Sequence, residues 1–336
     1  MISSRVYDVV SGERFLELPG FQTAFSTHVK LEGLNPAGSI KIKAAREMIL
    51  NAEEQGLISP GRELIESTSG NLGVALASIC AAKGYRITLV TDPNANARTV
   101  RFMKALGAEV VTVTRRDAAG GYLRTRIDYI RARLAADSRL VWLNQYANPG
   151  NAAAHSKHTL NEILDGFGVP DWLFVGTGTS GTLMGCVRRL RELALPTQVV
   201  AVDAVGSVTF GDHPGPRWIP GIGASRTPEI FSDDGSFLKV LVDEPATVRM
   251  CRRVAREYGL LLGGSSGSAL AAVEAMADRI PAGSRILTLS PDMGEGYLDT
   301  VYNDEWVRER YGADALSPQP ETDVETLLRL YGKEHA

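Results

Sequence analysis

The stretch Trp172-Leu-Phe-Val-Gly-Thr-Gly-Thr-Ser-Gly-Thr182 runs from apolar residues through a glycine-rich turn into a helical pattern. The same order of short β-branched run, loop and longer helical pattern recurs on both sides of it. Such alternation predicts an α/β fold in which mainly parallel sheets are flanked by helices. Ligands bind beyond the carboxyl ends of the strands in these folds, so a site is expected in the loops that follow the strands.

Two lobes are expected, because 336 residues exceed what one small core needs. The turn at Pro149-Gly150 lies near the expected boundary. We place an N-terminal lobe at 1–145, a C-terminal lobe at 146–312 and a tail at 313–336, with residues 1–35 packing on the C-terminal lobe. The expected strands are 63–65, 86–91, 109–114, 173–175, 198–203, 239–242 and 285–290. The expected helices are 44–55, 72–83, 99–106, 122–135, 152–164, 182–193, 246–258, 268–279 and, in the tail, 324–331.

The composition narrows the classes of partner. The net charge of -3 provides no broad cationic face, so no nucleic-acid partner is expected. No apolar run reaches membrane-spanning length, and residues 1–8 lack a signal-peptide pattern. The cysteines Cys80, Cys186 and Cys251 form neither a metal-ligand pattern nor a disulfide framework. A cytoplasmic protein without a metal or a membrane partner is therefore expected.

The first candidate loop, the lysine loop, is Asn35-Pro-Ala-Gly-Ser-Ile-Lys41. It leads into an amphipathic helix, so Lys41 is expected near a helix N-terminus, where the helix dipole disfavours a cation. Burial would disfavour the ammonium further and favour the free amine, which is the form that condenses with an aldehyde. Taken alone, the loop is more simply explained by a surface lysine. Lys43 is a rival that would point away from Lys41 on a helix.

The second candidate loop is Glu66-Ser-Thr-Ser-Gly-Asn-Leu-Gly73, which precedes an apolar helix. Its part Ser67-Thr68-Ser69-Gly70 is called the hydroxyl loop. Its hydroxyls, together with backbone N–H groups at a helix start, suit a carboxylate. The alternative is a simple helix cap, but a cap needs only one hydroxyl. We therefore favour an anion site.

The third, the glycine loop, is Gly176-Thr-Gly-Thr-Ser-Gly-Thr182. A glycine-rich turn that leads into a helix is suited to binding phosphate. Its glycines also satisfy the dinucleotide pattern G-x-G-x-x-G, with Asp203 where a ribose-binding acid is expected, so a nicotinamide oxidoreductase is an alternative. The hydroxyls around the turn instead favour a terminal phosphate monoester.

The fourth, the serine loop, is Gly263-Gly-Ser-Ser-Gly-Ser268. One of its hydroxyls could bind a heterocyclic nitrogen, although a serine-capped helix explains the loop equally well when it is taken alone. Taken together and in this order, the four loops resemble those of the cysteine synthase and cystathionine beta-synthase family of pyridoxal-phosphate (PLP) enzymes. The resemblance covers roughly residues 7–312 and implies the two-lobe fold of type II PLP enzymes, which is similar to the fold of the tryptophan synthase beta chain.

The resemblance implies a role for each loop. Lys41 would hold the cofactor as a Schiff base and act as the catalytic base, and Asn71 would lie beside the cofactor's 3-hydroxyl. Gly178, Thr179, Ser180, Gly181 and Thr182 would bind its phosphate, and Ser265 its pyridine nitrogen. Ser67, Thr68 and Ser69 would bind the substrate carboxylate, and Gln145 and Tyr146 would line the substrate pocket.

Further segments resemble enzymes of a siderophore route through 2,3-diaminopropionate, which join O-phospho-L-serine to L-glutamate. These segments are 65–71, 144–148, 201–207, 220–226 and Gly120-Gly121-Tyr122-Leu123 with Thr125-Arg126. The implied reaction is β-replacement by a homodimer acting on small amino-acid substrates. Arg226 is our candidate for binding a phosphate leaving group, because a guanidinium binds phosphate bidentately. A surface ion pair is equally plausible for Arg226.

Two departures bear on the substrate. Leu72 and Ser67 stand where sulfhydrylases of the family usually carry Thr and Pro. They make a sulfhydrylase that uses O-phosphoserine or O-acetylserine the second choice. A non-catalytic module is disfavoured, because a scaffold does not need Lys41. His155 and His158 are expected to be solvated or at the edge of the core, since no third ligand accompanies them.

Overall fold

The computed structural model describes residues 3–10, 12–59, 61–118, 120–211, 213–317 and 328–331. They form two compact units, each of which combines separate stretches of chain. The first unit comprises the described residues of Met1–Val10 and Asn35–Ala154, and the second those of Ser11–Leu34 and His155–Ala336. Each unit has its own sheet and its own hydrophobic core.

The first unit is built on a parallel sheet. Within the described residues this sheet has four strands in the order β5-β4-β3-β6. The strands are β3 (Glu63–Ser67), β4 (Arg86–Thr91), β5 (Glu109–Thr112) and β6 (Leu140–Trp142). The helices are α1 (Lys41–Glu54), α2 (Asn71–Lys83), α3 (Ala97–Ala105), α4 (Leu123–Ala136) and α5 (Pro149–Ala154), preceded by a 3₁₀ turn, η1 (Val6–Asp8).

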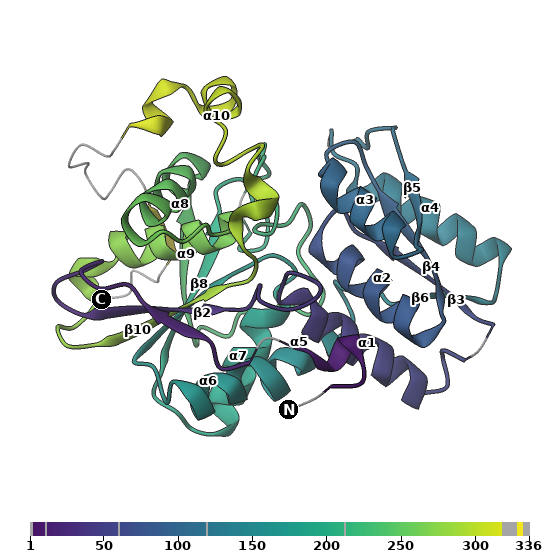
Figure 1. The fold of residues 1–336 in the computed structure, drawn as a ribbon, viewed down its shortest axis with the longest axis horizontal. Coiled ribbons are helices and arrows are strands. Elements are labelled where there is room, and N and C mark those ends of the chain that lie inside the picture. The colour runs from purple at the N-terminus through teal and green to yellow at the C-terminus, as the bar shows by residue number, and fades with distance from the viewer. Residues whose placement is uncertain are drawn as a thin grey trace. The chain divides into compact units, whose positions relative to one another are not determined.

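The core of the first unit lies mainly between the sheet and helices α1 to α3, whereas α4 packs on the opposite face (Figure 1). Helix α2 is apolar all round, and residues such as Leu76 and Ile79 are fully buried. Burial of each side chain of this size contributes about 1.5–3 kcal/mol. Gly73 allows α2 to approach closely, because a Cβ there would lie 2.8 Å from Thr68 Cγ2 and would also collide with Met103. The start of α2 is thereby fixed next to the hydroxyl loop.

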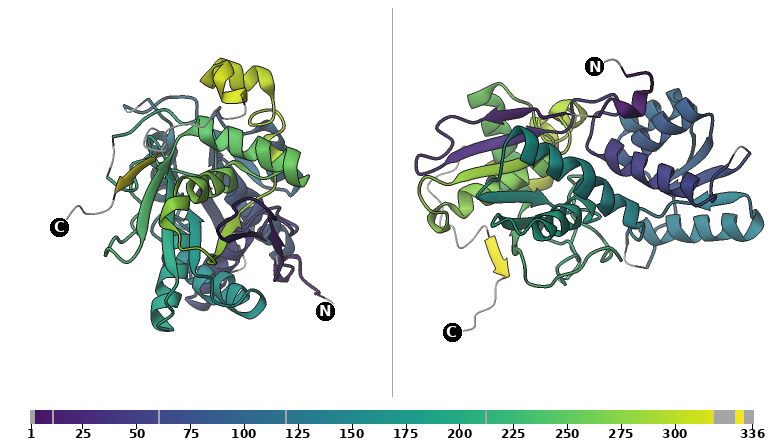
Figure 2. Two further views of the ribbon diagram at one scale, coloured as in Figure 1. Left: turned by 90° about the vertical axis from the view of Figure 1, so that its left-hand side faces the viewer. Right: turned by 90° about the horizontal axis from the view of Figure 1, so that it is seen from below.

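The second unit is built on a larger sheet. Within the described residues it has seven strands in the order β1-β2-β10-β7-β8-β9-β11, of which the five from β2 to β9 in this order are mutually parallel. The strands are β1 (Phe15–Glu17), β2 (Ser26–Leu31), β7 (Trp172–Gly176), β8 (Gln198–Ala204), β9 (Leu238–Val242), β10 (Arg285–Ser290) and β11 (Leu328–Tyr331). The hairpin of β1 and β2 lies beside β10 (Figure 2).

Helices cover both faces of this sheet. The helices of the second unit are α6 (Leu160–Gly166), α7 (Gly181–Glu192), α8 (Glu244–Tyr258), α9 (Gly264–Ala275) and α10 (Asp304–Tyr311). Helices α8 and α9 cover one face and α6 and α7 the other (Figure 1). A π-helix, η2 (His155–Thr159), precedes α6, and the 3₁₀ turns are η3 (Ala277–Arg279), η4 (Gly294–Tyr297) and η5 (Ala313–Leu316).

The predicted fold class, two mainly parallel sheets flanked by helices, is confirmed. The helix predicted at 324–331 is wrong at Leu328–Tyr331, which is strand β11 and pairs antiparallel with β9. The unpaired backbone groups of an edge strand are a template for such pairing. Residues 324–327 lie outside the described residues. Within the described part of the chain, no helix is both long enough and apolar enough to cross a membrane.

Candidate active site

The lysine loop is a structured turn in the first unit. The side chain of Asn35 closes it, accepting from the amide of Ala37 at 3.0 Å and donating to the carbonyl of Ser39 at 2.9 Å. Gly38 adopts a φ of 69°, in the left-handed region that favours glycine. Helix α1 begins at Lys41, whose amide donates to Ser39 Oγ at 3.3 Å. Lys41 therefore lies where the N-terminal end of the helix dipole disfavours a cation.

Lys41 and its rival Lys43 differ in exposure. The Lys41 side chain is half-buried, whereas Lys43 is 1% exposed, within the first unit. A half-buried amine at a helix start can reach a ligand without rearrangement of the core. The structure therefore favours Lys41 over Lys43 as the lysine available to a cofactor.

The hydroxyl loop connects β3 to α2. Gly70 precedes the helix, and no side chain caps α2, so the simple-cap interpretation of the hydroxyls is wrong. By contrast, Asp243 caps α8 in the usual way, accepting from the amide of Ala246 at 2.6 Å. Ser67 Oγ is buried and has no hydrogen-bond partner among the described residues. Uncapped N–H groups and an unused hydroxyl are what a carboxylate ligand requires.

Neighbouring strands hold the hydroxyl loop in place. The amide of Thr68 donates to the carbonyl of Val90 at 3.0 Å, at the end of β4. Gln145, which is 8% exposed, donates from Nε2 to the carbonyl of Ser67 at 3.1 Å. The predicted substrate residues Ser67, Thr68 and Gln145 are therefore brought together at the carboxyl ends of the strands. Ser69, Asn71 and Tyr146, all half-buried, lie beside them in the chain.

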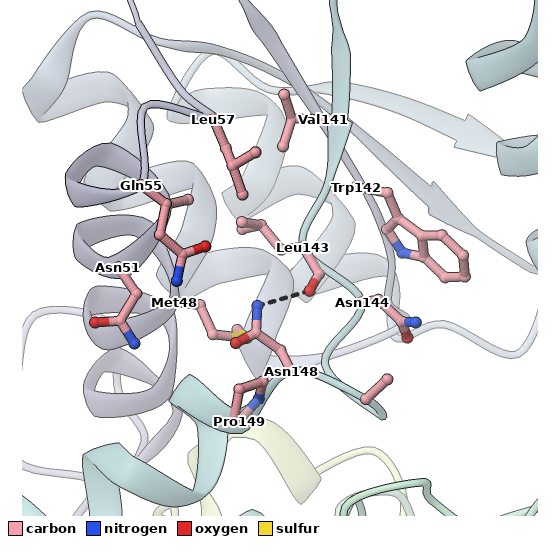
Figure 3. A pocket seen from close by; sticks show the side chains of 12 residues that line it. Met48, Asn51, Gln55, Leu57, Val141, Trp142, Leu143, Asn144, Asn148 and Pro149 are labelled. Atoms are coloured by element: carbon pink, nitrogen blue, oxygen red, sulfur yellow. Dashed lines mark hydrogen bonds between the residues drawn. The ribbon is translucent and has the colours of Figure 1, made fainter.

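A pocket of about 230 Å³ lies in the first unit, between α1 and the segment that follows β6. Met48 and Asn51 of α1, with Gln55 directly after it, line one side and face Leu143 and Asn148 across the pocket (Figure 3). Asn148 Nδ2 donates to the carbonyl of Leu143 at 2.8 Å and so holds the segment in a turn. No lysine or arginine is among the residues that line this pocket, so it lacks a charge to hold an anionic substrate.

The glycine loop connects β7 to α7 in the second unit. Ser180 has a φ of 65° and precedes α7 without capping it. The hydroxyl oxygens of Thr177 and Ser180 are buried and have no hydrogen-bond partner among the described residues. Buried hydroxyls without partners at a helix N-terminus fit a phosphate monoester, whose oxygens would accept their hydrogen bonds. Gly181 is buried, whereas Gly178, Thr179 and Thr182 are half-buried.

The turn at Gly221 and Gly223 packs against the glycine loop. A Cβ on Gly178 would lie 3.3 Å from the carbonyl oxygen of Gly221, and Gly223 donates its amide to the carbonyl of Thr177 at 2.8 Å. Gly221 has a φ of 95°, and a Cβ there would lie 3.9 Å from Ser265 Oγ. Ser265, the second residue of α9, is 2% exposed. The proposed phosphate and ring-nitrogen residues thus belong to one packed cluster.

Asp203 does not suit a ribose-binding role. It lies within β8 and is fully buried, and its carboxylate accepts from the amide of Ala204 at 2.8 Å. Burial raises its pKa to about 7, against hydrogen bonds from Ser207 and Ala204 that lower it. A ribose hydroxyl needs a carboxylate that it can reach from the end of a strand.

Arg226 and Arg126 lie in different surroundings. Arg226 Nη1 lies 2.9 Å from Glu229 Oε1, so it takes part in the ion pair that the sequence left open. Arg126, in α4, is 9% exposed, and its Nε lies 3.4 Å from Asp92 Oδ2, beyond the end of β4. Its Nη1 has no hydrogen-bond partner within the described part of the chain. We did not select Arg126 from the sequence, although its segment was part of the resemblance.

The expectation for His155 is wrong. Its side chain is fully buried, with Nδ1 3.0 Å from Thr159 Oγ1 and Nε2 3.3 Å from Thr182 Oγ1. His158 is half-buried, closer to what was expected. The signal that could have identified His155 is structural, because it lies on a π-helix, a rare element that is frequent at functional sites.

Comparison with known proteins shows which family the chain is related to. A family model described as pyridoxal-phosphate dependent enzyme matches residues 8–292. A protein of Ralstonia nicotianae named N-(2-amino-2-carboxyethyl)-L-glutamate synthase is 42% identical over 97% of this chain and 99% of its own length. A protein of the same name from Cupriavidus metallidurans is 45% identical over 83% of each chain. The crystal structure of an O-ureido-L-serine synthase superposes with a TM-score of 0.81 at 29% identity, covering 93% of this chain and 97% of that one.

The chain therefore belongs to the family of pyridoxal-phosphate dependent enzymes. Its fold is that of the type II enzymes of this family, with cysteine synthase-like structural relatives. The unpartnered hydroxyls at the glycine loop fit the cofactor's phosphate, and family membership favours this cofactor over a dinucleotide.

Proposed function

We propose that this enzyme catalyses β-replacement, joining O-phospho-L-serine to L-glutamate to form N-(2-amino-2-carboxyethyl)-L-glutamate. The observation that carries the proposal is the 42% identity to a synthase of that product over 97% of the chain. The second relative, at 45% identity, carries the same name. The departures at Leu72 and Ser67 from the sulfhydrylase pattern agree with it.

In the first unit, Lys41 would hold the cofactor, and its Nζ would move the α-proton of the substrate. The hydroxyls of Ser67, Thr68 and Ser69 and the uncapped start of α2 bind the substrate carboxylate. Asn71 contacts the cofactor's 3-hydroxyl, and Gln145 and Tyr146 line the substrate pocket. The unpartnered Ser67 hydroxyl and the Gln145 contact to the Ser67 carbonyl support these roles.

In the second unit, residues Gly178 to Thr182 bind the cofactor's phosphate through the amides and hydroxyls at the start of α7. Ser265 would hold the pyridine nitrogen, and its side chain is a neutral hydroxyl where a carboxylate would favour a proton on that nitrogen. The bound cofactor supplies an electron sink for negative charge at the α-carbon. A neutral partner at Ser265 would favour β-elimination and replacement over transamination.

Recognition of the phosphate leaving group requires a cation. Arg226 was selected from the sequence, and its position three residues after Gly223, in the turn that packs on the glycine loop, supports it. Arg126 is the second candidate, because a buried guanidinium with an unused N–H can bind phosphate strongly. Arg126 and the hydroxyl loop both lie at the carboxyl end of the first unit's sheet, through Asp92 and Val90.

The product places the enzyme in 2,3-diaminopropionate and siderophore biosynthesis. We further propose a cytoplasmic homodimer, as the family resemblance implies. The cysteines Cys80, Cys186 and Cys251 are buried thiols that form no disulfide with one another, as is usual in a reducing compartment. Their burial also agrees with a packing role.

The test is mass spectrometry of the products formed from O-phospho-L-serine with either L-glutamate or sulfide. The expected result is a glutamate adduct that requires the purified enzyme and added cofactor. Cysteine formation from sulfide with no glutamate adduct would transfer the assignment to the sulfhydrylases. Replacement of O-phospho-L-serine by O-acetyl-L-serine identifies the leaving group that the enzyme accepts.

A further inference from the structure

Glu66 is a buried carboxylic acid for which the proposed reaction has no use. It lies in β3 directly before the hydroxyl loop and is 1% exposed. Its Oε1 accepts two hydrogen bonds, from the amide of Ser67 at 2.8 Å and from Trp142 Nε1 at 3.0 Å. One oxygen atom thus connects the first residue of the hydroxyl loop to the neighbouring strand β6.

Ser67 is held on both sides of its backbone. Its amide donates to Glu66, and its carbonyl accepts from Gln145 Nε2 at 3.1 Å. The Ser67 hydroxyl, by contrast, is buried and has no partner among the described residues. The contacts therefore fix the position of the residue and leave its side chain for a ligand.

Trp142 anchors the other side of this contact. It is the last residue of β6, and its side chain extends away from α1 (Figure 3). The indole N–H donates to Glu66 Oε1, so the oxygen that accepts from the Ser67 amide also orients the Trp142 ring. Two strands that are adjacent in the sheet are thereby locked together at the point where both lead into the site.

The second oxygen, Oε2, is buried and has no hydrogen-bond partner among the described residues. Burial raises the pKa of Glu66 to about 7, against the hydrogen bonds from Trp142 and Ser67, which lower it. An unsatisfied buried polar atom costs about 1–3 kcal/mol. Because Glu66 is buried despite this cost, we infer that its contacts to Ser67 and Trp142 serve the site.

We infer that Glu66 is a positioning residue that sets the affinity of the hydroxyl loop for the substrate carboxylate by holding the Ser67 backbone. This rests on the proposed function in so far as the hydroxyl loop binds that carboxylate. Only the accepting oxygen Oε1 is needed, and no negative charge and no proton transfer is required of Glu66. Glutamine supplies the same acceptor at the same distance along the side chain, whereas alanine and aspartate do not.

The experiment compares Glu66→Gln, Glu66→Ala and Glu66→Asp, with Glu63→Gln as the matched control. Glu63 lies on the same strand, but its carboxylate accepts from Thr88 Oγ1 at 2.9 Å, away from the loop. Calorimetry gives the dissociation constants of O-phospho-L-serine and of O-phosphoethanolamine, which lacks the carboxylate. L-Serine and ethanolamine repeat this comparison without the phosphate. The indole N–H resonance of Trp142, assigned with Trp142→Phe, reports the hydrogen bond without any ligand.

Glu66→Ala and Glu66→Asp are expected to bind the carboxylate-containing ligands about tenfold more weakly, because the displaced hydroxyl loop loses one hydrogen bond to the ligand's carboxylate. Binding of the ligands without a carboxylate should not change. Both substitutions should also move the Trp142 resonance. Glu66→Gln should keep the wild-type resonance, affinity and turnover. Should Glu66→Ala fail to fold, Glu66→Asp provides the comparison.

The inference is overturned if Glu66→Ala and Glu66→Asp lose equal affinity for the two ligands of a pair, with and without the carboxylate. So does a large loss of turnover in Glu66→Gln at unchanged affinity, because it would make the carboxyl a proton donor or acceptor. If wild-type enzyme fails to bind O-phospho-L-serine while L-serine still reveals the carboxylate effect, the proposed substrate is wrong and the inference stands.

Discussion

His155 Nε2 lies 3.3 Å from Thr182 Oγ1, and this contact joins a fully buried imidazole to the first turn of α7. The other ring nitrogen lies 3.0 Å from Thr159 Oγ1, so both nitrogens are engaged within the second unit. The imidazole therefore orients the Thr182 hydroxyl, which we propose binds the cofactor's phosphate.

His155→Ala is expected to weaken pyridoxal-phosphate binding about tenfold, because the Thr182 hydroxyl loses the group that orients it. Titration of the cofactor-free protein, followed by absorbance, measures this. The matched control is His158→Ala on the same π-helix, which should bind as wild type does. Equal affinities of wild type and His155→Ala would remove the proposed role.

Lys41→Ala is expected to abolish the covalent link to the cofactor. Borohydride reduction followed by peptide mass spectrometry should find the reduced cofactor on Lys41 in wild type and nowhere in the variant. Lys43→Met provides the control, because it removes the rival amine while filling the same buried space. If the reduced cofactor were found on Lys43 in wild type, Lys43 and not Lys41 would be the lysine that holds the cofactor.

The phosphate leaving group separates Arg126 from Arg226. If Arg126 reads the phosphate, Arg126→Lys should raise the KM for O-phospho-L-serine at least about tenfold, because lysine cannot form the bidentate contact. Arg226→Lys should then have little effect, since that guanidinium already pairs with Glu229. Steady-state kinetics measures the KM for O-phospho-L-serine in each variant. A raised KM in Arg226→Lys and an unchanged KM in Arg126→Lys would assign phosphate binding to Arg226.

Gly73→Ala is expected to destabilise the first unit by about 1–3 kcal/mol, the usual cost of overpacking a core. The added methyl group would collide with Met103 and lie 2.8 Å from Thr68 Cγ2. Gly12→Ala is the control, because nothing lies within 4 Å of its Cβ position. Denaturant titration measures both variants, and equal stability would mean that α2 shifts without cost.

Stability should fall as the pH rises from about 4 to 7, in part through Asp203, whose pKa is raised to about 7 by burial. Below the pKa that Asp203 has in the unfolded protein, its carboxyl is protonated in both the folded and the unfolded state. Between the two values only the folded state keeps its proton, so the folded state loses up to about 4 kcal/mol over this window.

Asp203→Asn removes this contribution, and its stability should depend less steeply on pH between 4 and 7. Asp137→Asn is the control, because hydrogen bonds from Arg139 lower the pKa of Asp137 to about 2, so its contribution changes only below about pH 4 and this variant should keep the wild-type slope between pH 4 and 7. Denaturation curves at several pH values would contradict the prediction if Asp203→Asn and wild type followed parallel slopes.

The sequence predicted most of the framework, because the hydrophobic period and the glycine loops are local signals. Strands 86–91 and 285–290 match the structure at both ends. Helix starts were placed late where small residues resemble a loop. Helix α9, for example, begins at Gly264, although the sequence suggested residue 268. The first turn of a helix that binds a ligand lacks the usual side-chain cap, so its start is hard to recognise.

Other features depend on contacts that no local pattern carries. Strand β2 went unrecognised because its Lys30 looks like a surface residue. That ammonium is fully buried, 2.7 Å from Glu32 and 2.6 Å from Glu162, which is 132 positions further along the chain. Its pKa is raised because the pull of both carboxylates outweighs desolvation, the largest single contribution, which lowers it. The Glu66 contact to Trp142 is equally remote in sequence, at 76 positions.

The pairing of β2 with β10 sets the order in which the molecule can be assembled. Ser26 aligns with Arg285, and Leu31 with Ser290, so β2 leaves the ribosome long before its parallel partner is synthesised. Until then it has only the short strand β1 along one edge. Closing so large a loop is slow, and the open edge is exposed to mispairing meanwhile. The first unit, whose strands lie between residues 63 and 142, can form earlier. Chaperone demand during synthesis should therefore fall on the N-terminal hairpin of the second unit.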